Sequence, residues 1–141
     1  MVVTSEATTL WSGDLKNGAG TTKLDSSHAA EFPVSWAARI QGAAGKSNPE
    51  ELLGAAHSAC FSMVFANALA DFGTPPQSLQ VTAAVTFDTV AGITGSHLLV
   101  SAKVAGISEQ DFERIAIEAK VTCPVSRALS GIPITLEANL A

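Results

Sequence analysis

The feature that most constrains this chain is a long apolar helix, predicted to begin after Asn48 and to end before Gly73. Asn48 can cap the first turn, Pro49 suits the first helical position, and the acidic residues that follow favour the positive end of the helix dipole. Gly73, ahead of two prolines, is a typical stop signal. Apolar residues recur at steps of three and four and also fill the adjoining rows. Such a helix is expected in a core rather than on a surface.

Short strands are predicted on both sides of this helix. They are marked by β-forming residues or by alternation, with Gly, Asn and Asp turns between them, and cover residues 8–11, 20–24, 32–40, 81–88, 93–104 and 134–140. Two further helices are predicted to start at Ser108 and at Cys123-Pro124, the second ending at Gly131. This order favours an α+β fold, with antiparallel sheet and helices packed on it.

The length of 141 residues fits one domain with its own core, expected to cover residues 1–141. The composition is 47% hydrophobic and only 15% charged, against a usual charged share of about a quarter. Richness in Ala and Gly is one explanation. The other, which we favour, is that part of the surface is buried in an oligomer.

Charge and hydropathy argue against several classes of function. The net charge is −5 and no Lys/Arg cluster is present, so nucleic-acid binding is not expected. The longest apolar stretch is interrupted by His57, Asn67 and several serines, and is not expected to span a bilayer. The first residues lack a basic region followed by an apolar one, so we expect no signal peptide and a cytoplasmic location.

The chain contains two cysteines, Cys60 and Cys123. In a reducing compartment such a pair is more often catalytic, redox-sensing or metal-binding than structural, although two unrelated buried thiols are an alternative. Cys60 lies in the middle of the long helix, where burial should raise its pKa, and taken alone it is typical of core packing. Cys123 precedes Pro124 at the start of a short helix, where a thiolate could meet free backbone N–H groups.

Other side chains could assist these thiols. Arg39, in a nearly uncharged segment predicted as a strand, is the best candidate cation for a Cys60 thiolate, and Glu50 could hold its guanidinium. Alternatively, Arg39 is solvated and Glu50 only complements the helix dipole. His57 lies three residues before Cys60, on one face with it. We expect it to form hydrogen bonds in the core or line a pocket.

A metal site is the competing interpretation of the same residues. His57 and Cys60 have the spacing of metal ligands, and Cys123 with either His28 or His97 could complete a tetrahedral zinc site. The chain has no Cys-x-x-Cys pair, and the other histidines fall in predicted loop or strand positions. The alternative therefore stays open but is not favoured.

Two stretches carry a resemblance to a known family. Residues 48–63, NPEELLGAAHSACFSM, and residues 123–129, CPVSRAL, resemble the two cysteine motifs of the OsmC/Ohr family, the osmotically inducible proteins and organic hydroperoxide reductases. Element order and spacing agree over nearly the full chain, and the context of His57 and Ser62-Met63 is closer to the OsmC branch. The resemblance implies an α+β homodimer of intertwined chains, with antiparallel sheets around long central helices and active sites at the dimer interface.

The resemblance also implies roles for individual residues. Cys60 matches the peroxidatic cysteine and Cys123 the resolving one, and Glu50 matches the acid that anchors a catalytic arginine, for which Arg39 is the candidate. Arg39 would stabilise the thiolate, the peroxide would turn Cys60 into a sulfenic acid, and Cys123 would close a disulfide. The apolar surroundings of Cys60 favour organic hydroperoxides over hydrogen peroxide, and His57, Phe61 and Met63 are the expected substrate pocket.

The resemblance implies no bound cofactor, and an external dithiol such as dihydrolipoamide as the reductant that resets the cysteines. Two rival functions use the same residues without turnover. One is a redox-sensing or binding module, which would be oxidised once and stop. The other is a metal-binding or structural domain.

Overall fold

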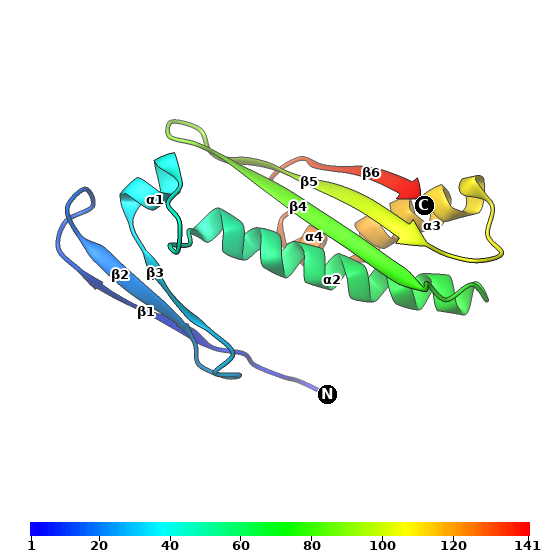
Figure 1. The fold of residues 1–141 in the computed structure, drawn as a ribbon, viewed down its shortest axis with the longest axis horizontal. Helices are drawn as coiled ribbons and strands as arrows, with labels where there is room; N and C mark the ends of the chain where they lie inside the picture. Colours follow the sequence, from blue (N-terminus) through cyan, green and yellow to red (C-terminus); the bar gives the residue numbers. More distant parts are fainter. The chain divides into compact units, whose positions relative to one another are not determined.

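The computed structural model describes residues 1–141, which form two compact units, residues 1–52 and 53–141 (Figure 1). The elements are β1 (Ala7–Ser12), β2 (Ala19–Leu24), β3 (Glu31–Val34), α1 (Trp36–Gln41), α2 (Pro49–Asp71), β4 (Ser78–Asp88), β5 (Gly92–Lys103), α3 (Glu109–Thr122), α4 (Pro124–Ala128) and β6 (Ile134–Leu140). This is the expected α+β class. That residues 1–141 act as a single domain stays a prediction.

The first unit is built on an antiparallel sheet in the order β1-β2-β3. The loop between β1 and β2 is closed by a hydrogen bond from the Gly18 N–H to the Asp14 carbonyl (2.9 Å), as the turn residues there predict. After β3 and α1 the chain comes back to the sheet, where Ser47 forms an isolated parallel β-bridge with Val34. Ser47 therefore brings the start of α2 to the edge of this sheet.

The predicted strand over residues 32–40 is wrong in its second half. β3 ends at Val34 and the chain turns into α1, because the Ser35 hydroxyl accepts a hydrogen bond from the Ala38 N–H (3.1 Å) and so caps a new helix. Two alanines in the first turn favour that helix over a strand. Arg39 therefore projects from a helix rather than from a strand.

α2 has the bounds that the sequence predicts. At its start the Asn48 side chain accepts a hydrogen bond from the Glu51 N–H (2.8 Å). At its end Gly73 has a φ of +96°, and the N–H groups of Gly73 and Thr74 donate to the carbonyls of Ala70 and Leu69 (2.9 Å each). This is the Schellman arrangement that glycine permits at the end of a helix.

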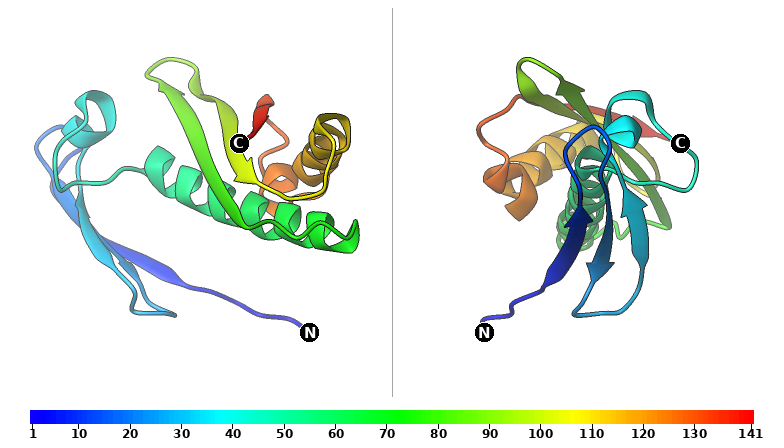
Figure 2. Two further views of the ribbon diagram at one scale, coloured as in Figure 1. Left: turned by 45° about the vertical axis from the view of Figure 1, so that its right-hand side comes forward. Right: turned by 90° about the vertical axis from the view of Figure 1, so that its left-hand side faces the viewer.

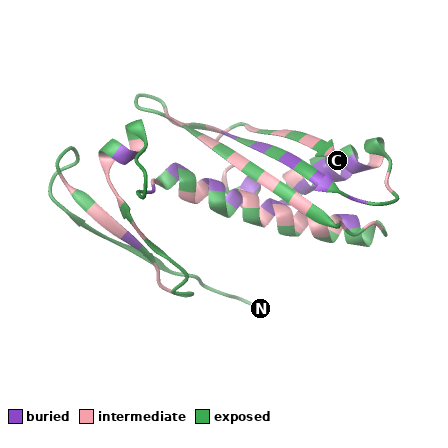
Figure 3. Ribbon diagram, viewed as in Figure 1, coloured by how far each residue is buried: buried purple, intermediate pink, exposed green.

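Only one side of α2 is covered within the chain (Figure 3). Its buried row consists of Glu50, Gly54, His57, Phe61, Phe65 and Leu69. The opposite side is exposed and consists of Ala55, Ala56, Ala59, Met63, Asn67 and Ala70. The helix therefore lies in the core through one side, as expected, while its other apolar residues stay uncovered in the single chain, because the sheet of the second unit covers one side of the helix only (Figure 2).

By length and composition alone, the 23 residues of α2 satisfy the requirements of a membrane-spanning helix, contrary to the expectation from its polar interruptions. The same test is passed by core helices of proteins that do not enter a membrane. The buried row of α2, which packs on a sheet through Phe61 and Phe65, is that of a core helix.

The sheet of the second unit has the order β4-β5-β6 and is mixed. β4 and β5 form an antiparallel hairpin, whereas β5 and β6 are parallel, with Ser96 opposite Ile134. The prediction of antiparallel sheet is therefore wrong for this last pair. Between β5 and β6 the chain forms α3 and α4, and a crossover through helices is the connection that parallel neighbours need.

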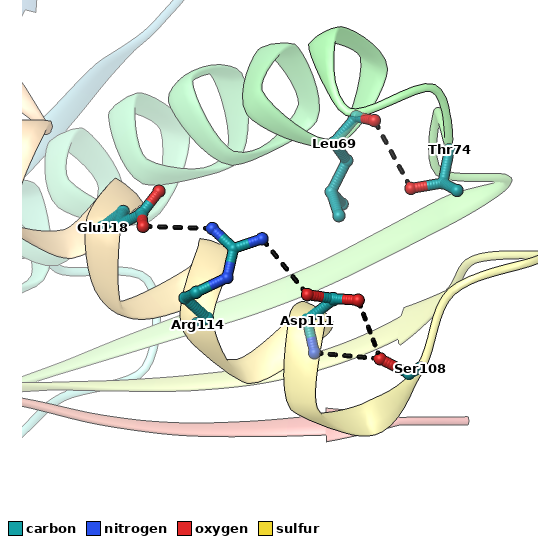
Figure 4. A network of polar contacts seen from close by, with 6 residues as sticks. All are labelled: Leu69, Thr74, Ser108, Asp111, Arg114 and Glu118. Atoms are coloured by element: carbon teal, nitrogen blue, oxygen red, sulfur yellow. Dashed lines mark hydrogen bonds and ion pairs between the residues drawn. The ribbon is translucent and has the colours of Figure 1, made fainter.

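The core of this unit lies between α2, α3 and the sheet. Phe65 stands between Phe61 and Phe112, with ring centroids 5.4 and 5.3 Å away, and β5 adds Leu98 and Val100. α3 is capped by Ser108, whose hydroxyl accepts a hydrogen bond from the Asp111 N–H (3.1 Å; Figure 4). On α3, the half-exposed Arg114 pairs with Asp111 and Glu118. α3 thus has the apolar and charged sides expected of a helix at a surface.

Candidate active site

The second unit brings the two cysteines together. Cys60, half-buried, comes from the middle of α2, and Cys123, which has no exposed surface, lies between α3 and α4. Both are free thiols; Cys60 packs against the core cluster that contains Cys123, close enough for Cys123 to influence its ionisation. The sequence left the distance between them open. In the structure both cysteines belong to one packed region of the second unit.

The surroundings of Cys60 oppose its ionisation. Burial raises the pKa of the Cys60 thiol, and the neighbouring Cys123 raises the pKa further, while the backbone N–H of Val125 lowers it in part. The net direction is upward, as its apolar neighbours predict. A thiolate at neutral pH therefore needs a positive charge that the immediate surroundings of Cys60 do not contain.

Cys123 differs from the expectation in one respect. α4 begins directly after it, but the Cys123 side chain accepts no capping hydrogen bond from that helix. The side chain is instead part of the apolar core, together with residues of α3 and β5. Of the N–H groups at the start of α4, that of Val125 faces the sulfur of Cys60. The start of α4 therefore serves the other cysteine.

His57 lies one turn before Cys60 and is fully buried. Its Nδ1 is 2.7 Å from the Ser96 hydroxyl of β5, and its Nε2 is 2.7 Å from the Ser126 hydroxyl of α4. Burial lowers the pKa of His57, so the ring is neutral at physiological pH, with one nitrogen donating and the other accepting. The expectation of hydrogen bonds in the core is confirmed.

Neither serine is indicated as a site residue by the sequence patterns described above. Ser96 occupies the buried face of β5, in a row that continues with Leu98, Val100 and Ala102. A hydroxyl in such an apolar row is a signal that a buried polar group lies opposite. Ser126 lies in the second cysteine motif, three residues after Cys123, which is the spacing that separates His57 from Cys60.

The first unit brings Arg39 and Glu50 together. The Arg39 Nη2 and Nε atoms donate to Glu50 Oε1 at 2.6 and 3.0 Å, and Nε also reaches Oε2 at 3.2 Å. The Glu50 side chain is 7% exposed and that of Arg39 is 28% exposed. The pair therefore has the fork geometry of a strong, partly desolvated ion pair, and not that of a solvated arginine.

A cavity of about 290 Å³ lies in the same unit, beside this ion pair. Its walls are mainly apolar and include Trp11, Leu15, Val34, Trp36 and Leu52, with Arg39 among the lining residues. A cavity of this kind suits a small molecule with an apolar body and one polar end.

The predicted pocket residues occupy different surroundings. His57 and Phe61 are fully buried in the core of the second unit, whereas Met63 is 72% exposed on the open side of α2. The alternative zinc site is not assembled either, because His97 is exposed and bonded to Thr135, and no group of three His, Cys, Asp or Glu side chains is close enough to share a metal ion. Both ring nitrogens of His57 are engaged by serines.

The fold and the site together define an α+β protein with a paired-thiol centre. The sequence pattern of the OsmC-like protein family matches residues 42–137. Peroxiredoxin OsmC of Escherichia coli (strain K12) is 41% identical over 133 residues, which cover 92% of each chain, and the peroxiredoxin OsmC of Shigella flexneri matches equally. The chain therefore belongs to the OsmC-like family.

Solved structures show the same fold at lower identity. An OsmC-like protein of Mycoplasma pneumoniae superposes with a TM-score of 0.75 at 16% identity, covering 100% of this chain and 99% of the other. The organic hydroperoxide resistance protein OhrB of Bacillus subtilis gives 0.67 at 19% identity, covering 99% and 98%. At these identities the comparison establishes the fold alone.

Proposed function

We propose that this protein is a thiol-dependent peroxidase that reduces organic hydroperoxides to alcohols. The observation that carries the proposal is the proximity of two free thiols, Cys60 and Cys123, on a chain 41% identical to proteins named peroxiredoxin. Hydrogen peroxide is a second, poorer substrate. The chemistry needs no bound cofactor, because the cysteine sulfur itself is oxidised and reduced.

The reaction has two chemical steps. The Cys60 thiolate attacks the distal oxygen of the hydroperoxide, the O–O bond breaks, and the alkoxide leaves as an alcohol after taking a proton, so that Cys60 becomes a sulfenic acid. The Cys123 sulfur then attacks the Cys60 sulfur, and hydroxide leaves as water. A dithiol reductant, with dihydrolipoamide as the candidate, reduces the disulfide and restores both thiols.

Arg39 is proposed as the cation that stabilises the Cys60 thiolate, with Glu50 holding it. Ten residues of α2 separate Glu50 from Cys60, a rise of about 15 Å along one helix. A guanidinium held at Glu50 cannot span that rise to the sulfur of the same helix. We therefore propose a homodimer, in which Arg39 of one chain serves Cys60 of the other.

The exposed side of α2 supports this assembly. It carries Ala55, Ala56 and Ala59, whose small side chains allow close approach of a second helix, and the strongly exposed Met63. An apolar row of this kind is costly in water and is expected at an interface between subunits. The low charged content of the chain points in the same direction.

The cavity beside Arg39 supports the choice of substrate. Its apolar walls would hold the hydrocarbon part of an organic hydroperoxide, while the guanidinium would bind a peroxide oxygen. We place the enzyme in the cytoplasm, where thiols are kept reduced. Phe61 and Met63 contribute to the site only through the packing of α2 and its dimer contact.

The test is peroxide consumption by the purified protein with cumene hydroperoxide or hydrogen peroxide and a dithiol. We expect steady turnover, faster with cumene hydroperoxide than with hydrogen peroxide. Cys60→Ser should abolish it. Cys123→Ser should permit one oxidation of Cys60 and little recycling. One oxidation and no turnover in the unaltered protein would indicate a redox sensor. Intact thiols with bound metal would indicate a metal-binding domain.

A further inference from the structure

The helices α2 and α4 contact each other through two matched pairs of residues. Cys60 of α2 lies near Cys123, the residue that precedes α4, and the His57 ring of α2 is hydrogen-bonded to the Ser126 hydroxyl of α4 (2.7 Å). In each helix segment the two members are three residues apart, so the pairs lie side by side in opposite order along the two segments. The hydrogen bond between His57 and Ser126 therefore lies directly beside the two cysteines.

Burying the polar ring of His57 costs free energy unless both of its nitrogens form hydrogen bonds. It is fully buried, and each of its nitrogens requires a hydrogen-bonding partner that is itself almost fully buried, Ser96 at 2% and Ser126 at 6% exposed. The rest of the buried row of α2 beyond it, Phe61, Phe65 and Leu69, is apolar. An apolar side chain would fill the same space, but it would fix neither the position nor the rotation of α4.

Apart from the bond of Ser126 to His57, α4 is held by the apolar packing of Val125 and by its direct continuation from α3 through Cys123. It is five residues long, and its cap at Cys123 makes no side-chain hydrogen bond. A helix this short is not stable by its own backbone bonds. The bond from Ser126 to His57 is directional, whereas the apolar contacts around Cys123 tolerate sliding.

We propose that His57 is a positioning residue, which through Ser126 holds α4 in the register where the Cys123 sulfur faces Cys60. The inference rests on the proposed peroxidase cycle for its purpose. Its direct consequence concerns thiol chemistry alone. A pinned register raises the effective concentration of one sulfur at the other, and so favours closing the Cys60–Cys123 disulfide over leaving Cys60 oxidised.

The two serines provide matched variants for the test. Ser126→Ala and Ser96→Ala each remove one hydrogen-bond partner of the His57 ring. Only Ser126 belongs to α4. The probe is glutathione, since two glutathione thiols reduce the disulfide and form one glutathione disulfide. Equilibration of each variant in glutathione redox buffers, read by mass after alkylation, measures the effective concentration of the cysteine pair without any peroxide.

We expect Ser126→Ala to lower that effective concentration by about tenfold, the factor that one buried hydrogen bond is worth. Ser96→Ala should lower it clearly less at a similar loss of melting temperature, and Ser126→Thr, which keeps a hydroxyl, should restore most of it. His57→Phe should match or exceed Ser126→Ala, which covers the case of a poorly folding serine variant. Equal effects of the two alanine variants, following the loss of stability, would overturn the proposal.

This experiment also separates the inference from the proposed function. If the protein closes its disulfide in glutathione buffers in the predicted order of variants but does not consume peroxide, the positioning role stands and the peroxidase fails. If peroxide is consumed and the variants do not differ in effective concentration, the peroxidase function stands and the positioning role fails.

Discussion

The guanidinium of Arg39 is held by both oxygens of Glu50, the shortest contact being 2.6 Å, and the carboxylate itself is almost fully buried. α1 contributes the cation and the first turn of α2 contributes the anion. The acid therefore does more than complement the helix dipole, because it fixes the direction in which the guanidinium points.

Glu50→Gln should leave Arg39 without its anion and lower peroxide turnover by about tenfold or more. The loss of a charged hydrogen-bond partner should also lower the free energy of unfolding by about 1–3 kcal/mol. Initial rates with cumene hydroperoxide and urea unfolding measure the two effects. Glu31→Gln is the matched control, because it removes a carboxylate from the exposed pair Lys23–Glu31 in the same unit and should change neither.

The pKa of the Cys60 thiol is raised by burial, so its reaction with iodoacetamide should depend on the arginine. In Arg39→Ala the alkylation rate should rise with pH only under alkaline conditions, because the thiolate forms late. In the unaltered protein the same rise should occur at lower pH. Alkylation of Cys60 in a Cys123→Ser background, followed by mass spectrometry, gives both profiles, and coinciding profiles would exclude Arg39 as the stabilising cation.

The buried His57 should make the protein less stable in mild acid. Its pKa is lowered by burial from an ordinary 6.5, so the unfolded chain binds the proton more readily than the native one. The stability is complete above pH 6.5 and falls as the pH drops below it, with a slope of at most about 1.4 kcal/mol per pH unit, levelling off below the native pKa.

Urea unfolding between pH 7.5 and 5 measures this slope. His57→Gln, which removes the titrating group, should flatten it. His97→Gln, which replaces an exposed histidine bonded to Thr135, provides the comparison. An unaltered slope in His57→Gln would assign the acid sensitivity to other groups.

Gly54→Ala should destabilise the protein although alanine is the better helix former. A Cβ at Gly54 would lie 2.8 Å from the Ala83 carbonyl oxygen of β4, a backbone atom that cannot move alone. α2 would have to shift away from the sheet, at a cost of about 1–3 kcal/mol. Thermal unfolding measures this, with Gly131→Ala as control because its Cβ would meet nothing. An increase in melting temperature for Gly54→Ala would contradict the close contact.

The sequence predicts most of this fold because its signals are local. The start and end of α2 depend on Asn48 and Gly73, which act within one turn, and the structure confirms both. The predicted strand after Val34 fails for a local reason as well. Ser35-Trp-Ala-Ala follows β-forming residues and so favours a longer strand, but Ser35 caps a helix.

The features that the sequence did not reveal depend on long-range partners. The direction of β6 relative to β5 follows from the crossover through α3 and α4, and not from alternation, which is the same in parallel and antiparallel neighbours. The partners of His57 come from residues 39 and 69 positions away. The proximity of Cys60 to Cys123 was expected only through the family resemblance, since neither residue signals the other.

The complete burial of Cys123 means that the two sulfurs can react with different partners. Of the two thiols only Cys60 is partly exposed to solvent. In the proposed cycle Cys60 therefore reacts with peroxides and external reductants, while Cys123 reacts only with Cys60. Oxidative damage should then follow the same division. Irreversible oxidation to sulfinic acid should occur at Cys60. Its frequency depends on whether Cys123 forms the disulfide before a second peroxide molecule reacts with the Cys60 sulfenic acid.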